Sequence, residues 1–246
     1  MGPIIGILTR SGVNENGTPI EYCMESTRRT IVKAGGVPIM LTPPQDIDYF
    51  TTKSSEAPDL TGMEQEMILY QIEKLDGLFI PGGDKITKYD YYVLHFCLKR
   101  NIPILGVCLG MQMIANYKID NFKLLDVPNK ELHYKEDYAA PAHTVTIDKN
   151  SLLYKIIGRE EIIVNSHHLR CVDYTKECNV VAKSSDGVIE AVELKDYDFC
   201  LGVQWHPEIT VSDDINSKKI FECFMEKAKE KKESKIIIKS LFAQSG

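Results

Sequence analysis

Residues 106–110, Gly-Val-Cys-Leu-Gly, are the stretch that decides the fold of this 246-residue chain. An apolar run precedes them at residues 102–105, and a helix-like run follows at residues 111–115. A strand, a glycine-flanked nucleophile and a helix in this order form a nucleophile elbow, whose turn is too tight for flanking side chains. This turn would place the Cys108 sulfur near the positive end of the following helix, which favours the reactive thiolate. A buried structural cysteine is the alternative interpretation, because free cysteines are common in protein cores.

Two further segments carry the groups that a cysteine nucleophile needs. Residues 203–208 read Val-Gln-Trp-His-Pro-Glu, so His206 and Glu208 stand two positions apart after a strand-like run. A histidine can take the thiol proton, and a carboxylate can hold the imidazole in the right tautomer. Residues 81–83 read Pro-Gly-Gly, and glycine lets a backbone N–H approach a reacting carbonyl oxygen. Each segment alone also fits an ordinary surface pair or a strand-end turn.

Apolar runs alternate with helix-like patterns through the first half of the chain, which predicts βαβ units and a parallel sheet. The expected strands there are residues 4–8, 37–41, 77–80 and 102–107, and the expected helices are residues 21–34, 63–75 and 89–100. Short runs that look antiparallel follow at residues 143–147, 162–165, 180–182, 187–194 and 199–204, before a final helix at residues 217–231. We therefore expect an α/β fold: a three-layer sandwich with a central, mostly parallel, flavodoxin-like sheet and an antiparallel extension.

Length, net charge and cysteine content narrow the class of protein. The length predicts a single domain over residues 1–246, of which about 233–246 would be a basic C-terminal tail. The net charge of −6 and the lack of a basic patch argue against a nucleic-acid partner. Seven cysteines without C-x-x-C spacing predict reduced thiols and a cytoplasmic protein. No apolar run is long enough to cross a membrane, and no signal-peptide pattern is expected at the N-terminus.

In this order, the Pro-Gly-Gly, Gly-Val-Cys-Leu-Gly-Met-Gln and Gly-Val-Gln-Trp-His-Pro-Glu segments resemble the class I glutamine amidotransferase superfamily. Within it, residues 164–168 and 188–193 are similar to the γ-glutamyl-γ-aminobutyrate hydrolase-like peptidase family C26. The resemblance implies a hydrolase that cleaves the γ-glutamyl amide bond of a small compound through a glutamyl thioester, releasing glutamate and an amine. The alternative is a glutaminase subunit that delivers ammonia to a separate synthetase.

The resemblance also implies a role for individual residues. Cys108 would attack the γ-carbonyl, His206 would move the proton, and Glu208 would hold the imidazole. The backbone N–H of Leu109, just after the nucleophile, is one oxyanion donor expected from the elbow. The backbone N–H of Gly83 is the second donor, by family resemblance.

The same resemblance places Gln112, Ser166 and His167 next to the substrate. A zinc site at His167 and His168 is not expected, because no companion ligands have metal-site spacing. We therefore predict no metal and no cofactor. The expected partner is a small γ-glutamyl substrate. The sequence leaves open whether the chain forms a homodimer. A separate synthetase subunit is a partner only if the chain is a glutaminase subunit.

Several positions depart from the usual pattern of the γ-glutamyl hydrolases. Leu109 stands where these enzymes usually carry arginine, and residues 84–88 lack the usual Asp-x-x-Pro-like stretch. The histidine pair is followed by leucine and arginine at residues 169–170 in place of glutamine. These segments would shape the acceptor half of the pocket, so the sequence leaves the amine half of the substrate open.

Overall fold

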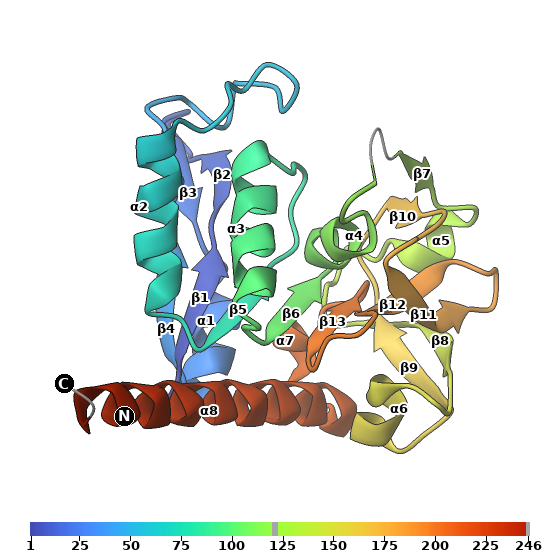
Figure 1. Cartoon of the computed structure of the whole chain (residues 1–246). Helices are drawn as coiled ribbons and strands as arrows, with labels where there is room; N and C mark the ends of the chain where they lie inside the picture. Colours follow the sequence, from blue (N-terminus) through green and yellow to red (C-terminus); the bar gives the residue numbers. More distant parts are fainter. Residues whose placement is uncertain (120–122, 245–246) are drawn as a thin grey trace.

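A nine-stranded sheet forms the middle layer of the computed structural model, which describes residues 1–119 and 123–244 (Figure 1). In spatial order its strands are β4 (Val37–Leu41), β1 (Ile4–Leu8), β5 (Gly77–Ile80), β6 (Ile104–Val107), β13 (Cys200–Val203), β12 (Ile189–Leu194), β11 (Cys178–Ser184), β8 (Pro141–Ile147) and β9 (Glu161–Asn165). Neighbours from β4 to β13 are parallel, and those from β13 to β9 are antiparallel. The predicted α/β fold with a parallel core and an antiparallel extension is confirmed.

Helices cover both faces of the parallel half, which explains why its strands read as continuous apolar runs. The helices are α1 (Glu25–Lys33), α2 (Gly62–Glu73), α3 (Lys88–Lys99), α4 (Leu109–Ala115), α5 (Lys130–His133), α6 (Leu152–Ile157), α7 (Pro207–Thr210) and α8 (Ile215–Gln244). Side chains alternate between the faces of a strand. Phe79 thus belongs to a core with residues of α1 and α8, whereas Leu78 and Ile80 belong to a core with residues of α2, α3 and α4.

Two elements differ from the sequence-based expectation. The helix expected from residue 21 begins at Glu25, because the chain before it forms a hairpin of β2 (Arg10–Val13) and β3 (Pro19–Tyr22). Two short strands, β7 (Leu124–Asp126) and β10 (Arg170–Val172), pair with each other, although no strand is expected at either position. The β7–β10 pair joins segments far apart in the chain, so local periodicity does not reveal it, whereas the β2–β3 hairpin is local.

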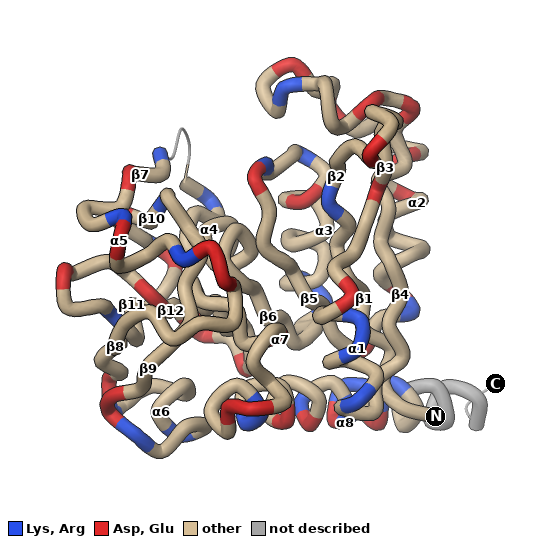
Figure 2. Tube along the Cα trace, turned by 180° about the vertical axis from the view of Figure 1, so that it is seen from behind, with Lys and Arg blue, Asp and Glu red and all other residues tan. Residues whose placement is uncertain are grey.

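The last helix, α8, runs along one edge of the sandwich and is longer than expected (Figure 1). Lys232 Nζ donates to the Gly2 carbonyl at 2.9 Å, and Lys235 Nζ lies 3.2 Å from the Asp76 carboxylate. These contacts attach part of the basic segment predicted as a tail to the sheet; residues 245–246 of that segment lie outside the described residues. In Figure 2, acidic and basic residues are interspersed along this helix.

No helix within the described ranges has the length and apolar character that a membrane crossing requires.

Candidate active site

Cys108 lies at a strained turn between β6 and α4. Its backbone has φ 51° and ψ −107°, a conformation that non-glycine residues rarely adopt and that costs about 1–3 kcal/mol. A Cβ atom at Gly110 would lie 2.1 Å from the Ile80 carbonyl oxygen, so only glycine fits there. A Cβ atom at Gly106 would lie 2.8 Å from the Gly110 carbonyl carbon. The structure thus has the strand–turn–helix geometry that the glycines of residues 106–110 predict.

Adjacent parallel strands bring the two distant motifs together. β6 and β13 pair in register with Val107 opposite Val203, and the Cys108 N–H donates to the Val203 carbonyl at 2.8 Å. The carboxyl ends of parallel strands meet at one edge of a sheet, where ligand sites of open α/β folds form. His206, three residues beyond β13, therefore lies at the same edge as Cys108.

His206 and Glu208 form a buried pair. His206 Nδ1 lies 2.8 Å from Glu208 Oε1, and both side chains are less than a tenth exposed. The second nitrogen, His206 Nε2, has no hydrogen-bond partner in the described part of the chain. Asn165 holds the backbone of His206 from both sides: its Oδ1 accepts from the His206 N–H at 3.2 Å, and its Nδ2 donates to the His206 carbonyl at 3.0 Å.

The Cys108 sulfur and the His206 ring both face Gly82. A Cβ atom at Gly82 would lie 3.0 Å from His206 Cε1 and 3.8 Å from Cys108 Sγ. Burial by itself lowers the pKa of His206, but the Glu208 carboxylate and the Cys108 sulfur outweigh burial and raise this pKa to about 10. The imidazole thus stands next to the cysteine sulfur, which is the arrangement that a cysteine nucleophile and its base require.

The Pro81–Gly83 turn forms one wall of the same pocket, and Arg10 holds it in place. Arg10 Nη2 donates to the Pro81 carbonyl at 2.7 Å, and Nε donates to the Gly82 carbonyl at 3.1 Å. Arg10 Nη1 lies 3.0 Å from Asp90 Oδ1, and both side chains are buried. Because the guanidinium binds both carbonyls, it constrains the orientation of the Gly83 peptide, and Arg10 itself lines the pocket.

Leu109 is the first residue of α4, so its N–H has no acceptor within the helix. Gly83 lines the pocket too, and it follows the carboxyl end of β5, the parallel neighbour of β6. The two backbone groups predicted as oxyanion donors thus belong to the turns on either side of Cys108.

The other predicted substrate residues separate into two groups. His167 lines the pocket, where its ring stacks on Tyr138 at 3.7 Å between centroids. Gln112 is buried, and its Nε2 donates to the Arg170 carbonyl and to Gln204 Oε1, both at 3.0 Å. Ser166 is buried too, and its hydroxyl donates to the His133 carbonyl at 2.7 Å. The structure brings neither Gln112 nor Ser166 to the pocket, because their polar groups bind neighbouring segments of the chain.

Sequence reasoning did not find Arg10 and Tyr138. Arg10 follows the first buried strand at the edge where the parallel strands end, and this position was the available signal. Tyr138 comes from a segment without periodicity, and its ring meets the edge of His206 at 5.8 Å between centroids. Nothing in the local sequence marks it.

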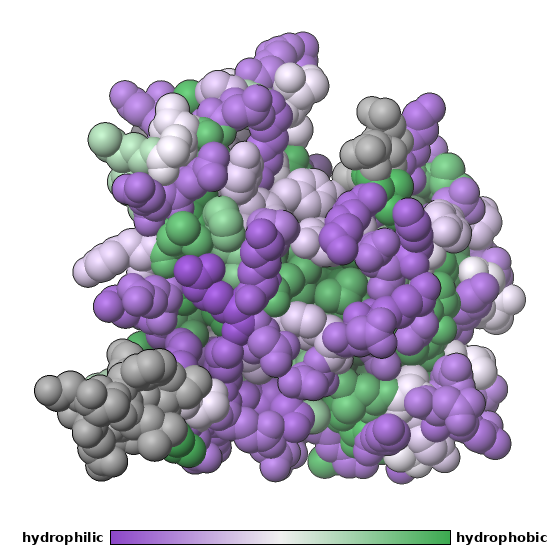
Figure 3. All heavy atoms as spheres, in the orientation of Figure 1, coloured by the Kyte–Doolittle hydropathy of each residue, from purple (hydrophilic) through white to green (hydrophobic). Residues whose placement is uncertain are grey.

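A second hollow, lined by Tyr92, His95, Tyr117 and Ile119, opens between α3 and the segment after α4. In the space-filling view the molecule is notched on this side (Figure 3). None of the predicted catalytic residues lines it.

A model of the peptidase C26 family matches residues 87–208. γ-Glutamyl-γ-aminobutyrate hydrolase PuuD of Escherichia coli strain K12 is 27% identical over 254 residues, covering 91% of this chain and 92% of PuuD. The chain is thus similar to the peptidase C26 group of class I glutamine amidotransferase-like proteins. Protein NtpR of Enterococcus hirae is 26% identical and covers 92% of this chain and 99% of NtpR. The chain is a hydrolase that acts on amide bonds, as predicted.

Solved structures share the fold of this chain at low sequence identity. A glutamine amidotransferase from Thermotoga maritima superposes with a TM-score of 0.55 at 16% identity, covering 99% of this chain and 98% of that chain. The glutaminase domain of Trypanosoma brucei CTPS, solved with bound acivicin, gives a TM-score of 0.58 at 19% identity, covering 93% of this chain and 94% of that domain. The C26 match includes Cys108, His206 and Glu208, whereas Arg10 and the Pro81–Gly83 turn precede it.

Arg10→Lys should lower kcat by about 10- to 100-fold, because a small displacement of the Pro81–Gly83 turn would misplace the groups that face the reacting atoms. Lysine keeps the charge next to Asp90 but cannot hold both the Pro81 and the Gly82 carbonyls in a fixed fork. Steady-state kinetics of amide hydrolysis will measure the effect, and circular dichroism will check folding. Arg28→Lys is the matched control, since Arg28 forms an exposed ion pair on α1. A wild-type kcat in Arg10→Lys would show that the guanidinium does not position this turn.

Proposed function

We propose that this chain hydrolyses the γ-glutamyl amide bond of a small γ-glutamyl compound and releases glutamate and an amine. One observation carries the proposal: Cys108 sits at a strained elbow facing His206, and Glu208 binds the opposite nitrogen of that imidazole. This is the relation between nucleophile, base and orienting carboxylate that acyl transfer requires.

The first half-reaction breaks the amide bond. The Cys108 thiolate adds to the γ-carbonyl carbon, and the carbonyl oxygen becomes an oxyanion. The N–H groups of Leu109 and Gly83 stabilise this charge; removal of one such donor typically costs about 3 kcal/mol. His206 Nε2 then gives its proton to the amine nitrogen as the C–N bond breaks. The products of this half-reaction are a free amine and a glutamyl thioester on Cys108.

The second half-reaction restores the enzyme. Neutral His206 takes a proton from water as the water oxygen adds to the thioester carbonyl. The C–S bond breaks, glutamate leaves, and Cys108 returns as the thiolate beside a protonated His206. Glu208 keeps the Nδ1 proton oriented throughout, so the imidazole presents Nε2 to the reacting groups in both steps.

The pocket supports a small-molecule substrate. Its volume is about 170 Å³, which is below the range of about 300–1,000 Å³ that drug-sized ligands occupy. Tyr22, Tyr138 and His167 line it together with the Pro81–Gly83 turn. PuuD, by its name a γ-glutamyl-γ-aminobutyrate hydrolase, aligns over 91% of this chain and supports a compound with a γ-glutamyl group and a small amine.

Purified chain should cleave γ-glutamyl amides with a kcat/KM at least about tenfold above that for free glutamine, because contacts to the acceptor half can be used in the transition state. The experiment measures glutamate released from glutamine and from a panel of γ-glutamyl amides and peptides, with Cys108→Ala as the background. A preference for glutamine, or activity that appears only with an added cellular partner, would favour the glutaminase subunit instead.

A further inference from the structure

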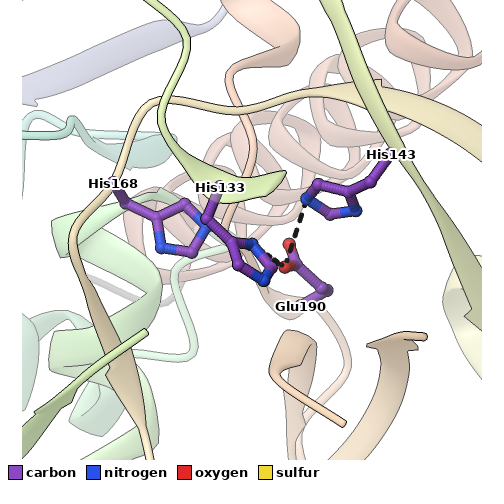
Figure 4. Close-up of side chains that lie close together, drawn as sticks. All are labelled: His133, His143, His168 and Glu190. Carbon is purple, nitrogen blue, oxygen red and sulfur yellow. Dashed lines mark ion pairs between the residues drawn. The ribbon is translucent and has the colours of Figure 1, made fainter. Parts of the chain in front are cut away.

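Four buried side chains outside the pocket point toward one another (Figure 4). They are His133 at the end of α5, His143 on β8, His168 after β9 and Glu190 on β12. One ligand atom of each lies within 4.8 Å of those of the others. Glu190 Oε1 is 3.3 Å from His133 Nδ1, 3.5 Å from His143 Nε2 and 3.8 Å from His168 Nε2. We call these four residues the His3Glu cluster.

The outward nitrogen of each imidazole already has an acceptor. His133 Nε2 lies 3.1 Å from the Asp186 carboxylate. His143 Nδ1 lies 3.3 Å from the Thr144 carbonyl, and His168 Nδ1 lies 3.0 Å from the Arg170 carbonyl. A nitrogen that faces a carbonyl or a carboxylate carries the proton, so the inward nitrogen of a neutral imidazole has a free lone pair. With three neutral imidazoles, three lone pairs would face the Glu190 carboxylate.

This arrangement is unfavourable without a cation. The three inward nitrogens and both Glu190 oxygens have no hydrogen-bond partner among the described residues. Buried polar groups normally find partners, and an unpaired one is costly. A single proton between Glu190 and one imidazole would satisfy one nitrogen and leave the other two facing the carboxylate. A divalent cation at the centre would satisfy all four side chains at once.

We propose that the His3Glu cluster binds one zinc ion as a closed structural site. Zinc in such sites is tetrahedral with bonds of about 2.0–2.2 Å, which puts neighbouring ligand atoms about 3.3 Å apart. The three nitrogen–oxygen distances of 3.3–3.8 Å are close to these edges. Neutral imidazoles and a carboxylate are ordinary zinc ligands, and four protein ligands leave no open position for a substrate.

The surroundings match those of a metal site. Asp186 accepts from His133 as the carboxylate partner that commonly orients a zinc-bound histidine. Ser184 in turn binds Asp186, with Oγ 2.5 Å from its Oδ1. The carboxylates of Glu190 and Asp186 balance the charge of one divalent ion.

The ion would brace one wall of the catalytic pocket. His168 follows His167, which lines the pocket, and Asn165 of the same loop holds the His206 backbone. Glu190 continues this link, because its carbonyl accepts from the Gln204 N–H at 2.8 Å. The sequence-based expectation of no metal considered His167 with His168, but the fold directs these neighbours to opposite sides and supplies the companion ligands from three other segments.

Metal analysis of the purified full-length chain tests the site. We expect about one zinc per chain by mass spectrometry of the metal, and a tetrahedral visible spectrum when cobalt(II) replaces zinc. Cys108→Ala serves as the background for zinc titrations, so that the pocket thiol and His206 do not contribute a second site. Asp186→Asn should weaken zinc binding about 10- to 100-fold, and Glu190→Gln more than that.

His95→Asn is the matched control, because His95 lies outside both the pocket and the cluster. This variant should keep the bound zinc and the zinc affinity of the background. Circular dichroism checks that each variant folds. If Glu190→Gln does not fold, Asp186→Asn still tests the site, because the Asp186 side chain is partly exposed and its replacement disturbs the core less. A folded wild-type chain that binds no zinc at micromolar concentration would overturn the proposal. Equal zinc affinity in Asp186→Asn, Glu190→Gln and the background would overturn it as well.

Discussion

Cys108→Ala will reduce glutamate release by on the order of 10⁵- to 10⁶-fold, because no group is left to form the thioester. The fold should survive, since alanine replaces one small buried side chain and keeps the glycines that allow the turn. Residual activity above the uncatalysed rate will come from binding and from the oxyanion donors alone. Steady-state kinetics with a γ-glutamyl amide, together with a thermal melt, will separate loss of chemistry from loss of structure.

A γ-glutamyl electrophile provides the complementary measurement. Peptide mapping should find the label on Cys108. Burial raises the pKa values of the Cys97 and Cys200 thiols, so neither presents a thiolate to the reagent. Cys223→Ala on α8 is the matched control and should keep both activity and labelling. A label on Cys23, which also lines the pocket, would contradict the assignment of Cys108 as the nucleophile.

His206→Ala should cost about as much as loss of the nucleophile, on the order of 10⁶-fold in kcat, whereas Glu208→Gln should cost about 10⁴-fold. The difference arises because glutamine leaves the imidazole in place but removes the charge that orients it. The double variant should be little worse than His206→Ala, since the two residues act as a unit. Near-normal activity of His206→Ala would move the base elsewhere, and His167 in the pocket wall would be the first candidate.

Glu208→Gln should also change the pH profile. The Glu208 carboxylate favours the imidazolium and contributes to the raised His206 pKa of about 10. Its removal lowers that pKa, so the protonated His206 that the leaving amine needs is lost at a lower pH. The alkaline limb of kcat/KM should therefore shift to lower pH in Glu208→Gln, with His95→Asn as the control. An unchanged alkaline limb would show that Glu208 does not set the charge of His206.

Most of the parallel half of the fold was predictable from local sequence. Strands that are buried on both faces must be apolar throughout, so β1 and β5 stand out as short runs that end in glycine, proline or polar residues. The glycines around Cys108 reveal the elbow because no other residue fits so close to the Ile80 carbonyl. The order of the three motifs then places the chain in its superfamily.

The loop of residues 165–168 shows what local sequence could not determine. Its four side chains contact four different parts of the molecule: Asn165 holds the His206 backbone, Ser166 the His133 carbonyl, His167 the pocket and His168 the buried cluster. Neighbouring side chains on an extended segment point to opposite sides. A shift of the segment by one residue would therefore turn a side chain from the pocket into the core. Sequence reasoning therefore identified the segment but not the direction of each side chain.

The sequence by itself determined the α/β class and the elbow and predicted the roles of Cys108, His206 and Glu208, because each motif depends on residue types at short spacing. Only the tertiary structure decided that Arg10 clamps the Pro81–Gly83 turn and that three distant histidines meet Glu190. These contacts join segments far apart in the chain. Their geometry is set by strand pairing and core packing over the whole molecule, which no local pattern records.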